Sequence, residues 1–314
     1  EQFFEELDIP KPDYNLGISG GTHGQMTGKM LIAIEEVLIK EKPDWILVYG
    51  DTNSTLAAAL AAAKLHFPIC HVEAGARTHC MTNPEEINRI CTDHLSTLLL
   101  VSTPSGINEL EREGLAERAV FVGDPMYDAF LHYRDEVNPD DLKLIKLNGK
   151  EEKLPGQYYY LTCHREENTS DSSLNEIFRA MEELELPVIY PVHPRNKKRA
   201  IKIADSMECK NIILSEPVGY LESLCLVSHA EKVITDSGGL QREAYFAGKQ
   251  CVTILNFVVW PETMVDNRNQ LSAPKAEDIL EKLNAEQRIC EEYVPFGDGK
   301  SAVKIVECMI KKGE

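Results

Sequence analysis

Three absences narrow the classes of protein that this sequence can encode. No apolar run approaches the roughly 20 residues that a membrane-spanning helix needs. The nine cysteines are scattered without a Cys-x-x-Cys pair, so neither a disulfide framework nor a zinc site is indicated, and reduced thiols in a cytoplasm are expected. Basic residues are outnumbered by acidic ones, 33 to 51, and the net charge of −18 argues against a general binder of nucleic acids or acidic membranes.

What remains is typical of a soluble globular chain with room for two domains, with 314 residues of which 43% are hydrophobic. Short β-branched runs alternate with stretches of helical periodicity at residues 55–66, 173–184 and 276–287. The predicted strands are residues 45–49, 68–72, 97–101, 120–122, 158–162, 187–191, 212–214, 232–235 and 250–255. This β-α-β alternation predicts an α/β fold with parallel sheets that carry helices on both faces.

One polar stretch divides the pattern. Residues 138–156 contain turn residues and no clear strand, and we interpret their end, 149–156, as a linker. We therefore expect an N-terminal Rossmann-like domain over residues 1–149 and a second one over residues 157–296.

Ligands of open α/β sheets bind beyond the carboxyl ends of the strands. In the first half of this chain, two acidic residues follow predicted strands. One strand is followed by "GDTNST", in which Asp51, Thr52 or Ser54 could simply cap the next helix. The next strand runs through "CHVEAGART" and ends in Glu73, which could simply accept hydrogen bonds from the following turn. Together they place two carboxylates at neighbouring strand ends, as acid–base chemistry requires.

A third acid follows in "TNPEEINRICTDHLS". Asn83 suits an N-cap, Pro84 suits the first helical position and Glu86 occupies the capping-box position, which leaves Glu85 unexplained. The residues expected to face the core are Ile87, Ile90, Cys91 and Leu95. Glu85 either pairs with Arg89 four residues on, or serves as a catalytic acid on the first helical turn.

In the second half, two strand ends carry histidine next to arginine. "CHREEN" places His164 beside Arg165, and "PVHPRN" places His193 close to Arg195. A lone histidine is usually structural, but one beside an arginine at a strand end can also meet an anion.

The stretch "VITDSGGLQREAYFAGK" predicts a phosphate site. Ser237, Gly238 and Gly239 follow a strand, and a helix is expected to begin at about Leu240. Glycines allow close approach of a ligand to the backbone, and the first N–H groups of a helix favour phosphate. An ordinary Ser-Gly-Gly turn would not explain Glu243, which lies on the apolar helical face and could hold sugar hydroxyls. This half therefore predicts a nucleotide site.

These segments, together with "PFGDGKSA", resemble the non-hydrolysing UDP-N-acetylglucosamine 2-epimerase family in order and over nearly the whole chain. The resemblance implies a GT-B-like fold, in which two Rossmann-like domains enclose a cleft and a C-terminal helix, here residues 297–314, returns to the first domain. The family pattern begins with a strand and a Gly-Thr-Arg-Pro-Glu turn that are not found before Glu1. The first sheet is therefore expected to lack its first strand.

Carried over by motif position, the resemblance assigns two groups of residues. The family's catalytic residues fall on Asp51, Glu73, Glu85 and His164. Its UDP contacts fall on Ser237, Gly238, Gly239 and Glu243, and we add His193 and Arg165 as expected contacts of the same ligand.

The resemblance implies inversion at C2 of UDP-N-acetylglucosamine by elimination and re-addition of UDP, with no cofactor and no metal. We expect a cytoplasmic homodimer that supplies precursors of cell-surface polysaccharide and contacts neither nucleic acid nor membrane. The alternative substrate is UDP-2,3-diacetamido-2,3-dideoxyglucuronate, whose epimerases "SGGLQREAYFAGK" resembles more closely. A GT-B glycosyltransferase and a non-catalytic binder of nucleotide sugars are further alternatives.

Overall fold

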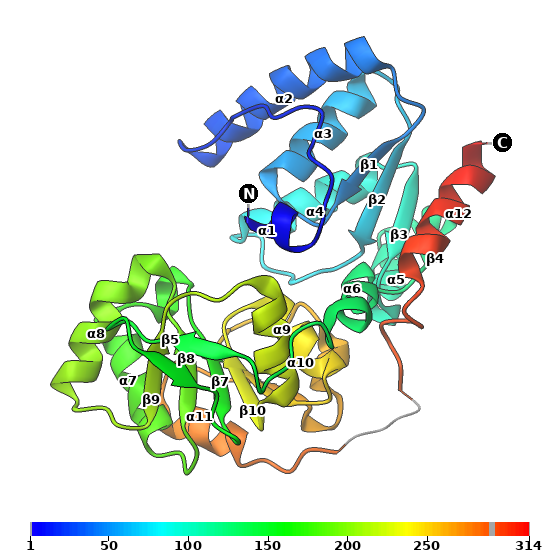
Figure 1. Cartoon of the computed structure of the whole chain (residues 1–314). Coiled ribbons are helices and arrows are strands. Elements are labelled where there is room, and N and C mark those ends of the chain that lie inside the picture. Colours follow the sequence, from blue (N-terminus) through cyan, green and yellow to red (C-terminus); the bar gives the residue numbers. More distant parts are fainter. Residues whose placement is uncertain (1, 289–292, 314) are drawn as a thin grey trace. The chain divides into compact units, whose positions relative to one another are not determined.

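Parallel β-strands form two separate sheets, as the α/β prediction requires (Figure 1). The computed structural model describes residues 2–288 and 293–313. Contacts divide the chain into a four-strand unit, which comprises the described residues of Lys11–Asp128 and Tyr293–Glu314, and a six-strand unit, which comprises those of Glu1–Pro10 and Ala129–Glu292. Residues 1, 289–292 and 314 of the predicted domains lie outside the described part.

The four-strand unit has the sheet order β1-β2-β3-β4 with all neighbours parallel. Its strands are β1 (Ile46–Tyr49), β2 (Ile69–Ala74), β3 (Leu98–Val101) and β4 (Ala119–Phe121). Its helices are α2 (His23–Glu41), α3 (Asn53–Lys64), α4 (Pro84–Leu95), α5 (Pro104–Arg112) and α12 (Ser301–Gly313). The helix α6 (Pro125–Tyr133) crosses the point where the chain passes into the six-strand unit.

The six-strand unit has the sheet order β12-β11-β10-β7-β8-β9, again parallel throughout. Its strands are β7 (Tyr159–Thr162), β8 (Val188–Pro191), β9 (Ile212–Ser215), β10 (Lys232–Thr235), β11 (Gln250–Thr253) and β12 (Asn269–Leu271). Its helices are α1 (Gln2–Glu6), α7 (Asp171–Glu182), α8 (Lys197–Ser206), α9 (Tyr220–His229), α10 (Gly238–Phe246) and α11 (Ala276–Leu283). The sequence analysis missed β12, whose residues Asn-Gln-Leu are mostly polar.

The expectation that residues 138–156 contain no strand is wrong. They form the antiparallel hairpin β5 (Lys143–Ile145) and β6 (Glu151–Lys153). The turn spans residues 146–149, where the Gly149 N–H donates to the Lys146 carbonyl oxygen and Gly149 has φ +81°, and an Asn-Gly pair is a common hairpin signal. Leu144 is buried and attaches the hairpin to the core of the six-strand unit. The chain thus divides after Asp128 rather than at residues 149–156.

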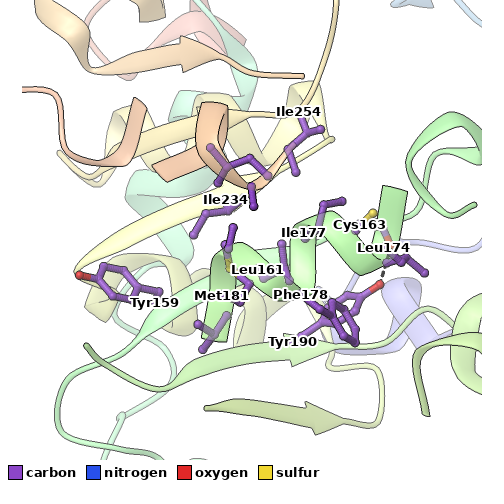
Figure 2. Packing of buried hydrophobic residues seen from close by; sticks show 14 of the residues in the cluster. Tyr159, Leu161, Cys163, Leu174, Ile177, Phe178, Met181, Tyr190, Ile234 and Ile254 are labelled. Carbon is purple, nitrogen blue, oxygen red and sulfur yellow. Dashed lines mark hydrogen bonds between the residues drawn. The ribbon is translucent and has the colours of Figure 1, made fainter. Parts of the chain in front are cut away.

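The six-strand sheet is covered by helices on both faces. Because side chains alternate along a strand, Tyr159 and Leu161 face one layer and Tyr158 and Tyr160 the other. Figure 2 shows the first layer, where the fully buried side chains of α7 pack against β7 and β8. The second layer contains residues of α9 and α10. Both faces of the sheet are therefore buried, and the loops at its carboxyl edge begin from packed strands.

The core of the four-strand unit contains many small side chains. The buried alanines of α3, among them Ala59 and Ala62, pack with Leu38 of α2 and with β1. Ile305 of α12 is buried in a cluster with Val72 of β2 and residues of β3. The C-terminal helix therefore belongs to the same core as residues 11–128.

Candidate active site

Asp51 stands at the carboxyl end of β1, in a turn begun by Gly50 at φ +60°. Thr52, not Asp51, caps α3, because its hydroxyl accepts the N–H of Thr55. The Asp51 carboxylate is instead 2.6 Å from Nη2 of Arg89, on α4. The acid is therefore held by a cation rather than used as a helix cap.

Glu73 occupies a β-bulge at the carboxyl end of β2. The pairing of β2 with β3 shifts between Val72 and Ala74, so Glu73 is the extra residue. Its φ of +72° lies in the left-handed region, which costs a non-glycine residue about 1–3 kcal/mol and persists only where the surroundings enforce it. Bulges beside active sites typically redirect a side chain. The conformation supports the proposed role of Glu73 in chemistry.

Glu85 is exposed on the first turn of α4. The predicted cap is confirmed, because the Asn83 side chain accepts the N–H of Glu85 and Pro84 is the first helical residue. The alternative pairing of Glu85 with Arg89 is not what the geometry shows, since Arg89 binds Asp51 and Glu86.

The prediction that α4 turns its apolar residues to the core is wrong for Ile87 and Cys91, whereas Leu95 packs against the core of the four-strand unit. Ile87 is 42% exposed and Cys91 is exposed, whereas Ile90 and Leu95 are half-buried. The buried residues of α4 are polar, namely Glu86, Asn88, Arg89, Thr92 and Asp93. Four of them, Glu86, Asn88, Arg89 and Asp93, have polar partners behind the strand ends, and these interactions outweigh the apolar periodicity of the helix.

Glu86 illustrates this inversion. It does not complete a capping box, but accepts the backbone N–H groups of Thr78 and His79 and the Thr78 hydroxyl at 2.8–3.0 Å. Its carboxylate also pairs with Arg89 at 3.0 Å. Burial alone would raise the pKa of Glu86, but these hydrogen bonds hold it below the usual range. Glu86 therefore anchors the loop that follows β2.

In the six-strand unit, His164 follows β7 and forms a pair with Asp236, which follows β10. The His164 Nδ1 is 2.8 Å from the Asp236 carboxylate. That carboxylate also accepts the backbone N–H groups of His164 and Arg165. Burial alone would raise the pKa of Asp236, but the His164 and Arg165 donors hold it below the usual range. An aspartate that orients Nδ1 leaves Nε2 of the histidine for a ligand.

The sequence analysis did not assign Asp236, although it meets the criterion that drew attention to Asp51 and Glu73. It is an acid directly after an apolar strand, and it is fully buried. Its partner His164 lies 72 residues away along the chain. The carboxylate was identifiable from the sequence, but its partner was not.

Two predicted residues lie beside this pair. The Arg165 side chain donates from Nε to the Asp236 carbonyl oxygen at 2.9 Å, and its guanidinium lies 5.4 Å from the Phe257 ring centroid. His193 and His164 both line a cavity of about 200 Å³ at the carboxyl ends of β7 and β8. Pro217 and Ser223, which no motif indicated, line it as well. The structure thus brings His164 and His193 to one cavity, and it places Arg165 on Asp236.

The Ser-Gly-Gly turn begins α10 two residues earlier than expected, at Gly238. The Ser237 hydroxyl accepts the N–H of Leu240 and is therefore the N-cap. A Cβ at Gly238 would meet Trp260 Nε1 at an ordinary 3.8 Å, and its φ is not left-handed, so the fold itself does not demand glycine there. Space kept clear over a helix N-terminus suits an anionic ligand.

Glu243 is buried on α10, where the helical pattern placed it. Its side chain is hydrogen-bonded with Tyr220, the first residue of α9. Burial raises the pKa of Glu243 to about 7, opposed only partly by Tyr220 and by the charge of Arg242. Tyr220, which the sequence analysis did not single out, has a pKa raised by burial and by Glu243.

Within residues 2–288 and 293–313, no three His, Cys, Asp or Glu side chains are grouped so as to hold a metal ion. Among the described helices, none has the length and apolar character that crossing a membrane requires.

The two parallel sheets, with their polar residues at the carboxyl edges, place the protein in the GT-B-like class of α/β proteins. A crystal structure of the UDP-GlcNAc 2-epimerase of Methanocaldococcus jannaschii with UDP-GlcNAc and UDP superposes with a TM-score of 0.84 at 38% identity, covering 98% of this chain and 87% of that one. Residues 1–310 match the family model for UDP-N-acetylglucosamine 2-epimerase.

Two curated relatives match nearly the whole chain. A UDP-N-acetylglucosamine 2-epimerase homologue of Methanococcus maripaludis is 45% identical over 98% of this chain and 87% of its own length. The UDP-2,3-diacetamido-2,3-dideoxy-D-glucuronate 2-epimerase of Pseudomonas aeruginosa is 42% identical over 99% of this chain and 87% of its own. The chain belongs to the UDP-N-acetylglucosamine 2-epimerase family and is a UDP-sugar 2-epimerase, an isomerase.

Proposed function

We propose that the protein inverts C2 of UDP-N-acetylglucosamine to give UDP-N-acetylmannosamine without hydrolysis. The observation that carries this proposal is the set of acids Asp51, Glu73 and Glu85 in one unit, with Glu73 held in a left-handed bulge at a strand end. Acids at such positions can exchange a proton with a bound sugar.

The reaction conserves atoms and electrons. A carboxylate that acts as a base removes the C2 proton while the bond from C1 to the UDP oxygen breaks. This step leaves a C1–C2 double bond and free UDP. UDP then returns to C1 as a proton is delivered to the opposite face of C2. Asp51, Glu73 and Glu85 are proposed to take and return this proton, and no external oxidant or cofactor is needed.

The six-strand unit is proposed to hold UDP. The N–H groups of Gly238 and Gly239 and the Ser237 side chain are proposed to face the phosphate, and Glu243 receives ribose hydroxyls. His164, oriented by Asp236, would donate to the diphosphate as its charge grows on departure, which favours elimination. Arg165 and His193 add positive or donor character beside it.

The diacetamidoglucuronate derivative is the second candidate substrate. A relative named for that substrate is 42% identical to this chain, and one named for UDP-N-acetylglucosamine is 43% identical, so identity favours neither. The homodimer, the cytoplasmic location and the supply of polysaccharide precursors stay predictions.

The test is NMR of each UDP-sugar incubated with the protein in D2O. We expect C2 inversion with deuterium entering at C2, faster for one of the two sugars, and the faster one identifies the substrate. A Glu73→Gln sample under the same conditions is the control for non-enzymatic exchange. UDP binding without inversion of either sugar would contradict the proposal and would support the non-catalytic binder, and transfer to an acceptor would support a glycosyltransferase.

A further inference from the structure

We propose that Asp93 is a positioning residue that holds the turns of Asp51 and Glu73 in place, acting through His71 and the Gly75 backbone. This inference rests on the function proposed above, because it concerns how the two acids are presented.

Asp93 and His71 form a fully buried pair behind the strand ends. Asp93 lies on the polar inner face of α4, and His71 lies within β2. Both side chains are 0% exposed, and the Asp93 Oδ1 is 2.6 Å from the His71 Nδ1. The other oxygen, Oδ2, accepts the backbone N–H of Gly75 at 3.1 Å. One carboxylate thus binds a residue of β2 before Glu73 and the turn after Glu73.

The second ring nitrogen of His71 reaches the other turn. Its Nε2 is 2.8 Å from the carbonyl oxygen of Gly50, the residue before Asp51. Both ring nitrogens therefore face acceptors, and only the imidazolium, with hydrogen on both, donates to both. The result is a hydrogen-bonded path from Asp93 through His71 to Gly50.

The two turns need such support. Gly50 has φ +60°, Gly75 has φ +81°, and Glu73 in the bulge of β2 has φ +72°. Gly75 also lies so close to Gly106 that a Cβ would approach the Gly106 carbonyl oxygen to 2.4 Å. Backbone of this kind persists only where neighbouring groups hold it in place, and the hydrogen bonds of Asp93 and His71 do so.

Charges alternate along the network. Arg77 Nη2 is 2.7 Å from Asp93 Oδ2, and Arg77 Nε is 2.7 Å from Glu113 Oε1. Burial alone would raise the pKa of Asp93, but His71 and Arg77 hold it below the usual range. Stability alone does not call for such a network, because apolar packing often stabilises a core as well. What apolar residues could not do is fix the Gly50 carbonyl and the Gly75 N–H.

The experiment compares three variants by steady-state kinetics. Asp93→Asn removes the charge that holds His71 and Arg77, and His71→Gln breaks the path to Gly50. Glu113→Gln is the matched control, since Glu113 touches Arg77 but neither turn. We expect kcat to fall about tenfold to hundredfold in the first two, with KM within about threefold, as when groups supporting a catalytic residue are removed. Glu113→Gln should keep kcat within about threefold.

A purely structural role predicts a different pattern, in which Tm falls in all three variants and kcat does not separate them. Folded Asp93→Asn and His71→Gln proteins with kcat equal to that of Glu113→Gln would overturn the proposal. If Asp93→Asn does not fold, His71→Gln decides. If neither folds, hydrogen exchange of the unmodified protein decides, and a Gly75 amide that exchanges as fast as an exposed loop overturns the proposal. An unmodified protein that inverts no UDP-sugar would instead defeat the proposed function.

Discussion

Both sheets are parallel, but they carry opposite chemistry at their carboxyl edges. In the four-strand unit the edge carries carboxylates, Asp51 and Glu73, beside a helix whose buried face is polar. In the six-strand unit it carries His164, the Gly238 turn and helix N–H groups. The same position in an α/β sheet can therefore supply either carboxylates that accept a proton or hydrogen-bond donors that bind an anion, depending on the residues that follow the strand.

Two buried carboxylates of the six-strand unit sharpen the point. Asp236 accepts several N–H donors, and its pKa lies below the usual range. Glu243 is as deeply buried but has fewer donors, and its pKa rises to about 7. Burial costs both groups their hydration, and the number of donors decides which form the protein favours.

The largest expected effect tests the contrast between the sheets. Asp51→Asn, Glu73→Gln and Glu85→Gln keep shape and remove charge, so each should lower the turnover rate by about 10²- to 10⁴-fold. Deuterium incorporation at C2 should fall in parallel. UDP affinity, measured by calorimetry, should stay within a few-fold, because UDP is assigned to the other unit.

The alternative for Glu73 is that it only secures its turn. In that case Glu73→Gln would lower the melting temperature while turnover stayed near normal. Such a result would remove Glu73 from the catalytic set.

The next effect concerns the contrast between Asp236 and Glu243. Because the folded-state pKa of Glu243 is raised from 4.5 to about 7, the unfolded chain loses this proton first as pH rises. Stability from this group is therefore complete below pH 4.5 and is lost between pH 4.5 and 7, by about 3 kcal/mol in total. Urea unfolding of the protein and of Glu243→Gln across this range should show the difference.

For Asp236 the sign is reversed, since its folded-state pKa is lowered. Its contribution should be present above its ordinary pKa of 3.8 and lost as pH falls below it.

A Glu243→Gln variant whose stability follows the same pH profile as the unmodified protein would contradict the pKa assigned to Glu243.

A smaller effect tests the helix N-terminus of α10. Gly238→Ala adds a methyl group that the protein itself accommodates, so unfolding free energy should be unchanged or rise by up to about 1 kcal/mol. UDP affinity should fall about tenfold, because the methyl group occupies the space assigned to phosphate. Calorimetry and urea unfolding measure the two quantities.

Gly248, just beyond the other end of α10, is the matched control. Its φ of +69° makes Gly248→Ala strained, so stability should fall by about 1–2 kcal/mol while UDP affinity stays unchanged. Equal UDP affinity in Gly238→Ala and the unmodified protein would argue against a phosphate at Gly238.

The smallest effect tests the inverted helix of the four-strand unit. Ile87→Ser on α4 should change the free energy of unfolding by no more than about 0.5 kcal/mol, because Ile87 is exposed. Ile177→Ala on α7, a fully buried position, should cost about 2–5 kcal/mol. A large loss in Ile87→Ser would mean that α4 buries its apolar face in solution.

Local chemistry by itself determined much of this protein. The strands of both sheets other than β12, the Asn83 cap and the Ser-Gly-Gly turn were identifiable because each depends on residues next to one another. The Asn148-Gly149 hairpin was identifiable too, and was missed only because its flanking residues are charged.

Only the tertiary structure decided which polar groups meet. His164 and Asp236 lie 72 residues apart, and Asp93 reaches His71 across 22 residues. The burial of the polar face of α4 likewise follows from partners in the turn after β1 and in the loop after β2, not from the periodicity of the helix. A buried charge is tolerated only beside its partners, and the chain brings those partners together only when the sheet forms.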